Sequence, residues 1–145
     1  MAQVIIPDAN VLLYAYNLVA PQHTAARSWL ESVLSGKELV LFPWPVLSAF
    51  LRISTSSHAF RQPLSMDESI EIIDAWLERD IAIVALPSND HWMVFSKLLK
   101  EAKVRGAMTT DAEIATYAIE HGATLYTCDR GFARFPGLTF VNPIP

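Results

Sequence analysis

Three aspartates of this sequence stand where a folded chain could gather them into one site: Asp8, Asp111 and Asp129. Asp8 directly follows a short apolar run, Asp129 follows a second run with one residue between, and Asp111 lies in the first turn of a predicted helix. Each also has a simpler explanation, as a helix cap, a first-turn acid or a turn residue. Their spacing makes an acidic site a hypothesis that depends on the fold.

Such a site would have a definite chemistry. Two carboxylates about 4 Å apart repel each other by roughly 4 kcal/mol at an effective dielectric constant near 20. A cluster of this kind must therefore bind a proton or a cation. Oxygen ligands favour the hard ions Mg²⁺ and Mn²⁺, which promote hydrolysis of phosphodiesters by activating water and offsetting charge on the phosphate.

The elements that would position these acids alternate along the whole chain. Apolar, β-branched runs predict strands at residues 4–6, 39–42, 81–86, 124–127 and 138–141. Helical spacing and capping patterns predict helices after Asp8 and at residues 23–34, 46–53, 66–77, 88–104 and 110–120, with capping boxes at 65–68 and 110–113 and a cap at Ser88. This alternation predicts a single α/β domain over residues 1–145, a three-layer α/β/α sandwich with a mainly parallel sheet.

That fold would bring two of the acids together. Ligands of open parallel sheets bind beyond the carboxyl ends of the strands. Asp8 and Asp129 follow such ends and converge if their strands are central neighbours. Asp111 joins them if its helix begins at the same edge.

The composition excludes several classes of protein. Of 145 residues, 52% are hydrophobic and 18% charged, which excludes a disordered chain and predicts a substantial core. The four tryptophans, Trp29, Trp44, Trp76 and Trp92, are expected to anchor the core or the contacts between helices. The single cysteine, Cys128, excludes a disulfide framework, fits a reducing cytoplasm and is expected to be a buried thiol. The sequence predicts neither a membrane span nor a signal peptide.

The charge distribution is uneven. The net charge of −4 argues against a protein coated in basic surface for bulk nucleic-acid binding. Yet the last third of the chain holds a group of basic residues that would either form a local basic surface or line an exposed helix face: Lys97, Lys100, Lys103, Arg105, Arg130 and Arg134.

Several motifs, in order along nearly the whole chain, resemble PIN-domain ribonucleases and, among them, VapC-type toxins of bacterial toxin–antitoxin pairs. The motifs are Asp-Ala-Asn-Val-Leu-Leu-Tyr-Ala at 8–15, Pro-Trp-Pro-Val-Leu-Ser-Ala-Phe-Leu-Arg-Ile at 43–53, Thr-Asp-Ala-Glu-Ile-Ala at 110–115, Ala-Ile-Glu-His-Gly-Ala-Thr-Leu at 118–125 and Thr-Cys-Asp-Arg-Gly-Phe-Ala-Arg-Phe-Pro-Gly-Leu at 127–138. The resemblance implies a cytoplasmic, Mg²⁺- or Mn²⁺-dependent endoribonuclease that forms a homodimer and is neutralised by a small VapB-type antitoxin.

The resemblance also assigns roles to individual residues. Asp8, Asp111 and Asp129 match the catalytic, metal-binding acids of the family, and Asn10 and Thr127 match supporting polar residues, the hydroxyl of Thr127 being available to hold a ligand or water. Arg52 and Arg130 are candidates for binding the phosphates of the substrate, although Arg52 could equally pair with an acid.

Two departures from the family pattern keep alternatives open. Ala49 stands where many relatives carry Glu, and Gly131 stands where many carry an acid, which puts a second metal ion in doubt. A degenerate PIN fold that binds RNA or a partner protein without cutting is therefore an alternative. A small phosphohydrolase with Asp8 as nucleophile is another, but Asn10 stands where that class has a second aspartate. The RNA target and the identity of an antitoxin are not encoded in these patterns.

Overall fold

A parallel sheet forms the centre of the molecule. The computed structural model describes residues 3–145, and the strands within them are β1 (Val4–Pro7), β2 (Leu39–Pro43), β3 (Ala82–Ala85), β4 (Thr124–Tyr126) and β5 (Thr139–Val141). They are ordered β3-β2-β1-β4-β5, and every adjacent pair is parallel. The predicted α/β class with a mainly parallel sheet is confirmed.

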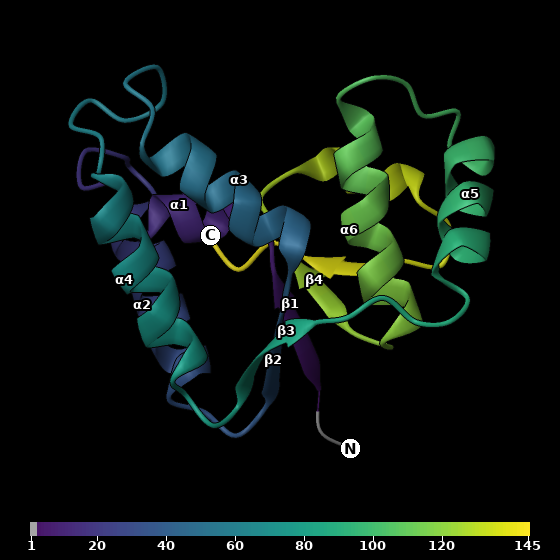
Figure 1. Cartoon of the computed structure of the whole chain (residues 1–145), viewed down its shortest axis with the longest axis horizontal. Helices are drawn as coiled ribbons and strands as arrows, with labels where there is room; N and C mark the ends of the chain where they lie inside the picture. The colour runs from purple at the N-terminus through teal and green to yellow at the C-terminus, as the bar shows by residue number, and fades with distance from the viewer. Residues whose placement is uncertain (1–2) are drawn as a thin grey trace.

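Helices cover the sheet on both sides. They are α1 (Ala9–Tyr14), α2 (His23–Leu34), α3 (Trp44–Ser54), α4 (Met66–Leu77), α5 (His91–Glu101) and α6 (Met108–Glu120). Helices α1 to α4 lie together on one side, and α5 and α6 lie together on the other, which gives the predicted three layers (Figure 1). No helix within residues 3–145 is both long and apolar enough to cross a membrane.

The order of the strands creates a switch point beside β1. From β1 the chain moves outward through β2 to β3, and it then returns to the other side of β1 to form β4 and β5. In open α/β sheets, the crevice at the carboxyl ends of the strands flanking such a reversal is the usual ligand site. Here those two strands are β1 and β4, which precede Asp8 and Asp129.

An aromatic cluster between the sheet and the first helical layer anchors the core. Trp76 of α4 is 1% exposed, stacks on Phe42 with ring centroids 5.3 Å apart, and donates a hydrogen bond from Nε1 to the hydroxyl of Tyr16. Trp44 and Trp92, however, are 55% and 70% exposed, so the expectation that they anchor the core was wrong. Each lies in the first turn of its helix, where a large side chain extends past the end of the packed layer.

The two predicted capping boxes have different outcomes. Ser65 and Glu68 exchange side chain–backbone hydrogen bonds at the start of α4, as predicted. The box predicted at 110–113 does not form, because α6 begins earlier, at Met108. The N-cap residue is therefore Ala107, whose side chain makes no capping hydrogen bond. Asp111 nevertheless remains in the first turn of α6.

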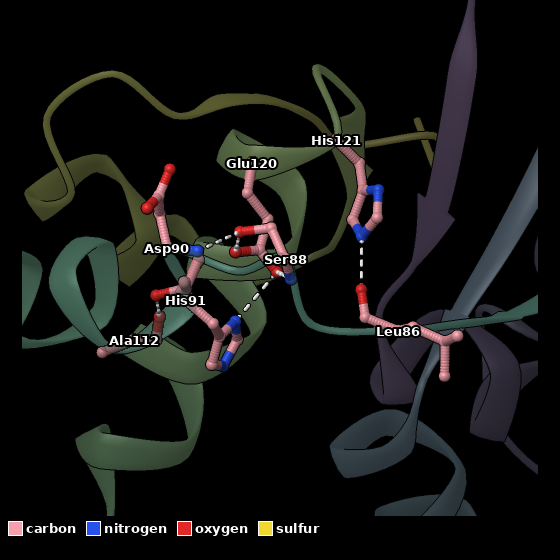
Figure 2. A network of polar contacts seen from close by, with 8 residues as sticks. Leu86, Ser88, Asp90, His91, Ala112, Glu120 and His121 are labelled. Carbon is pink, nitrogen blue, oxygen red and sulfur yellow. Dashed lines mark hydrogen bonds and ion pairs between the residues drawn. The ribbon is translucent and has the colours of Figure 1, made fainter.

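A buried carboxylate joins the loop after β3 to the end of α6 (Figure 2). Glu120, whose side chain is 3% exposed, accepts hydrogen bonds from the amide and hydroxyl of Ser88 and is 2.8 Å from Nδ1 of His91. Ser88 was expected to cap a helix over 88–104, but that helix begins at His91 and ends at Glu101. The hydroxyl of Ser88 instead donates to Glu120 and accepts from the amide of Asp90. The network fixes α5 against α6.

Candidate active site

The pairing of β1 with β4 places Asp8 beside Thr127. Pro7 lies opposite Tyr126 in the parallel register, and the amide of Asp8 donates to the carbonyl of Tyr126 over 2.9 Å. The residues that follow, Asp8 and Thr127, therefore leave the sheet side by side at its carboxyl edge. Both are buried, with 6% and 1% of their surface exposed.

The hydroxyl of Thr127 organises this edge. It donates to Oδ2 of Asp8 over 2.7 Å, and it accepts from Nδ2 of Asn10 over 3.1 Å and from the amide of Asp129 over 3.0 Å. A hydroxyl has one proton to donate and two lone pairs to accept with, so these bonds use its full capacity. Through these bonds Thr127 orients Asp8 and the backbone of Asp129, in keeping with the supporting position predicted for it.

Asn10 completes the same network from the first turn of α1. Its Nδ2 donates to Oδ2 of Asp8 over 3.3 Å as well as to Thr127, and its Oδ1 accepts from the amide of Cys128 over 3.2 Å. Asn10 thus ties α1 to the segment after β4. The thiol of Cys128 is half-buried, and burial followed by the nearby charge of Asp8 raises its pKa, which makes it a poor nucleophile.

Asp8 caps α1 and also carries a negative charge that burial disfavours. Its Oδ1 accepts from the amide of Ala9 over 2.7 Å, so the capping role expected from the sequence is present. Burial raises the pKa of Asp8 above its ordinary value, the hydrogen bonds from Thr127 and Ala9 act in the opposite direction, and the charge of Asp129 raises the pKa further. A carboxylate held like this gains from a cation that compensates its buried charge.

Asp129 is held by the turn that follows it. It precedes the short 3₁₀ helix η1 (Arg130–Arg134), and its Oδ1 accepts from the amide of Gly131 over 2.7 Å. A Cβ atom on Gly131 would lie 3.0 Å from this same oxygen. Glycine at this position therefore permits the observed orientation of Asp129, and an acid there would have to displace it.

Asp111 reaches the site from α6, on the opposite layer of helices from α1. Burial, followed by the negative charges of Asp8 and Asp129, raises its pKa to about 6, against a smaller lowering by the positive charge of Arg134. The three aspartates therefore act on one another, although they come from three distant segments. Because α3 begins directly after β2, its first turn lies at the same carboxyl edge of the sheet.

The candidate arginines differ in their placement. Arg52 lies on α3 and Arg130 on η1, and both are exposed. Neither makes a side-chain hydrogen bond or ion pair with any residue of the stretch 3–145. Sequence reasoning did not single out Arg134 as part of the acidic site, because its effect on Asp111 depends on η1 turning back toward α6.

The aspartates of the site could hold a hard cation only together with other ligands, such as waters or substrate oxygens. Within residues 3–145, no three His, Cys, Asp or Glu side chains lie close enough to hold a metal ion by themselves. Mg²⁺ usually takes only one or two carboxylates and keeps several waters or substrate oxygens. Ala49, which is 8% exposed, supplies no further ligand where many relatives have Glu.

Comparisons with known proteins agree with this arrangement. The PIN domain model matches residues 5–138. Ribonuclease VapC43 of Mycobacterium tuberculosis is 35% identical over 137 residues, which cover 94% of this chain and 93% of the relative. Among solved structures, a chain of the VapBC2 complex of Rickettsia felis, bound to a DNA fragment from its promoter, superposes with a TM-score of 0.70 at 23% identity, covering 97% of this chain and 98% of that one. VapC20 of M. tuberculosis, described as a toxin that cleaves the sarcin–ricin loop, superposes with a TM-score of 0.65 at 15% identity, covering 93% of this chain and 98% of its own. These two structures share the fold, while the family match and the sequence identity establish kinship: the chain belongs to the PIN-domain family and, within it, to the VapC-type ribonucleases.

Proposed function

We propose that this protein is an endoribonuclease that requires Mg²⁺ or Mn²⁺ and acts as the toxin of a toxin–antitoxin pair. The observation that supports the proposal is the hydrogen bond from Thr127 to Asp8 at the carboxyl edge of the sheet, beside which the charges of Asp8 and Asp129 help to raise the pKa of Asp111 to about 6. Carboxylates that repel one another in this way bind a divalent cation favourably. The VapC proteins to which the chain is similar are named as ribonucleases, which is the class of reaction proposed here.

The site residues have separable roles in this proposal. Asp8, Asp111 and Asp129 are the catalytic acids of this proposal, and they would hold the ion together with waters or substrate oxygens. When bound, the ion supplies an activated water and a positive charge at the phosphate. Thr127 and Asn10 orient Asp8 through hydrogen bonds. Arg52 and Arg130 are exposed and carry charges that attract the phosphates of the RNA.

The biological setting follows from the family. A complex of toxin and antitoxin from Rickettsia felis contains a chain with this fold. We therefore expect this protein to be neutralised by a small VapB-type antitoxin, to form a homodimer and to act in the cytoplasm, where its RNA substrate is found. The sarcin–ricin loop, the target of VapC20, is one RNA with which to begin.

The test is cleavage of RNA by the full chain with Mg²⁺ or Mn²⁺. Asp8→Asn, Asp111→Asn and EDTA should each abolish cleavage, whereas Asp74→Asn, the same change at an exposed position of α4, should leave it unchanged. Cleavage that survives both site variants and EDTA would exclude the proposed reaction.

A non-catalytic PIN domain is the second candidate, and Ala49 and Gly131 favour it, because the acids that many relatives carry at these places are missing. Such a protein would bind RNA without cutting it under any divalent ion. Growth arrest on expression that disappears with Asp8→Asn would exclude this candidate in favour of the nuclease.

A further inference from the structure

Arg134 spans the two segments that carry Asp111 and Asp129. It is the last residue of η1, and its Nε donates to the carbonyl of Gly131 over 3.1 Å. Its Nη1 contacts Sδ of Met108, the first residue of α6. Since residues three apart lie on the same side of a helix, the guanidinium is held on the side of α6 from which Asp111 projects.

The environment of this guanidinium differs from that of an ordinary surface arginine. Its charge lowers the pKa of Asp111 and is the smallest of the four influences on that carboxyl, after burial and the charges of Asp8 and Asp129. It forms no ion pair with a carboxylate of residues 3–145, and its Nη2 makes no hydrogen bond there, so part of its donor capacity faces solvent. An arginine fixed by two contacts has already lost side-chain freedom and therefore binds an anion at a lower entropic cost.

We propose that Arg134 binds a phosphate group of the RNA strand at the acidic site, next to the bond that is cut. This inference rests on the proposed function. A polyanion approaching Asp8, Asp111 and Asp129 meets repulsion, and a guanidinium beside them offsets it. The planar guanidinium also matches two phosphate oxygens at once, which an ammonium group does not. The contacts to Gly131 and Met108 hold it in place for this interaction.

A purely structural role makes a different prediction. If Arg134 only fastened η1 to α6, its loss would lower the melting temperature and would not alter the dependence of RNA binding on salt. A contact with one phosphate of a single strand changes the slope of log K against log salt concentration by about 0.7. The slope therefore separates a phosphate contact from a structural contact.

The experiment measures the affinity of a single-stranded RNA oligonucleotide of mixed sequence at several salt concentrations. It uses the full chain with Mg²⁺ and Asp8→Asn, so that the RNA is not cut, and adds Arg134→Gln, Arg134→Lys or Arg79→Gln. Arg79 is exposed and precedes β3, at the opposite, amino edge of the sheet, so it controls for the loss of one positive charge. Cleavage rates and melting temperatures of the same variants with Asp8 intact are measured in parallel.

We expect Arg134→Gln to weaken binding about tenfold and to reduce the slope by about 0.7. Arg134→Lys should keep the slope and recover only part of the affinity, and Arg79→Gln should alter neither. An unchanged slope in Arg134→Gln overturns the inference, whatever happens to the melting temperature. If that slope is unchanged while the protein still cuts RNA, only the inference fails. If the slope falls but no RNA is cut, the phosphate contact of Arg134 stands and the proposed nuclease fails. If the parent chain binds no RNA, both are wrong.

Discussion

The hydroxyl of Thr127 donates a hydrogen bond of 2.7 Å to Oδ2 of Asp8, although 119 residues separate them. The bond joins the carboxyl ends of β1 and β4, the two strands at the switch point of the sheet. It also lowers the pKa of a carboxylate whose burial raises it. Thr127 therefore favours the ionised form of Asp8, the form that binds a cation, against the larger effect of burial.

Loss of this hydrogen bond should impair the site without removing an acid. In Thr127→Val the β-branched shape is retained, but Asp8 loses the hydroxyl donor of Thr127 and keeps those of Ala9 and Asn10, while Asn10 and Asp129 lose an acceptor. We expect a loss of about 1–3 kcal/mol in the free energy of unfolding and a fall in cleavage rate of about tenfold or more. Thr127→Ser should recover most of both, as measured by denaturant unfolding and RNA cleavage. Full activity of Thr127→Val would show that the bond is dispensable.

The raised pKa of Asp111 predicts a specific pH dependence of stability. Its value of about 6 in the folded protein exceeds the ordinary 3.8, so between these values the folded state binds a proton that the unfolded state has released. The contribution of Asp111 to the free energy of unfolding is therefore present below about pH 4 and is lost as the pH rises to about 6. In EDTA, Asp111→Asn should remove this decline in the free energy of unfolding, so the variant should be more stable than the unaltered protein at pH 7.

The same proton competes with the cation for Asp111. At limiting Mg²⁺, RNA cleavage should rise with pH through the region near 6, and more Mg²⁺ should shift this rise to lower pH. Asp74→Asn serves as the matched control, because Asp74 is an exposed acid of α4 and should leave both pH profiles unaltered. A metal-free stability profile that is identical with and without Asp111 would contradict the predicted proton uptake.

Glycine at position 131 should matter through Asp129. A Cβ there would lie 3.0 Å from Oδ1 of Asp129, so Gly131→Ala must push the carboxylate aside by a few tenths of an ångström. We expect a several-fold loss of cleavage rate with little change in melting temperature, since Gly131 is exposed. Gly36→Ala is the comparison, because its Cβ would meet only the carbonyls at the end of α2, far along the chain from the acids. Equal activity of Gly131→Ala and the unaltered protein would show that Asp129 tolerates the shift.

Glu120 should be important for stability. Its buried carboxylate accepts from Ser88 and pairs with His91 (Figure 2), and removing it leaves the amide of Ser88 without a partner. Glu120→Ala should cost about 3 kcal/mol in the free energy of unfolding. Glu101→Ala, which removes an acid that lies 3.8 Å from Lys97 on the exposed face of α5, should cost less than about 0.5 kcal/mol. Thermal and denaturant unfolding compare the two, and equal effects would show that the network contributes little.

Much of the architecture could be predicted because it depends on local patterns. The helix at 23–34 was predicted with its observed bounds, and the Ser65–Glu68 capping box forms as its residue types indicate. The strand order could not be predicted, because hydrophobic runs do not specify which strands are neighbours. The meeting of Asp8 and Asp129 was therefore predicted only for the case in which their strands are adjacent. Leu18 shows another limit: it stands at helical spacing from Val11 and Ala15 but is 81% exposed, because α1 ends at Tyr14.

Within the site, residue types were predictable and their partners were not. The positions of Asp8, Asp111 and Asp129 relative to the predicted elements could be read from the sequence. The hydroxyl of Thr127 makes three hydrogen bonds, with Asp8, Asn10 and Asp129. The bonds to Asp8 and Asn10 depend on the pairing of distant strands, which local sequence does not specify. The proximity of Arg134 to Asp111 likewise depends on the turn of η1, for which the only local signal was the Asp-Arg-Gly sequence after β4.

The repulsion among the acids implies that a cation stabilises the folded protein. An ion that binds only the folded state adds about 2.7 kcal/mol to the free energy of unfolding at a concentration about 100 times its Kd. Mg²⁺ or Mn²⁺ should therefore raise the melting temperature by several degrees in the absence of RNA, and EDTA should reverse the shift. The increase should be largely lost in Asp8→Asn and Asp111→Asn and retained in Asp74→Asn. Stabilisation that is equal in every variant would come from binding elsewhere on the folded protein, and that result would contradict a metal site built from these residues.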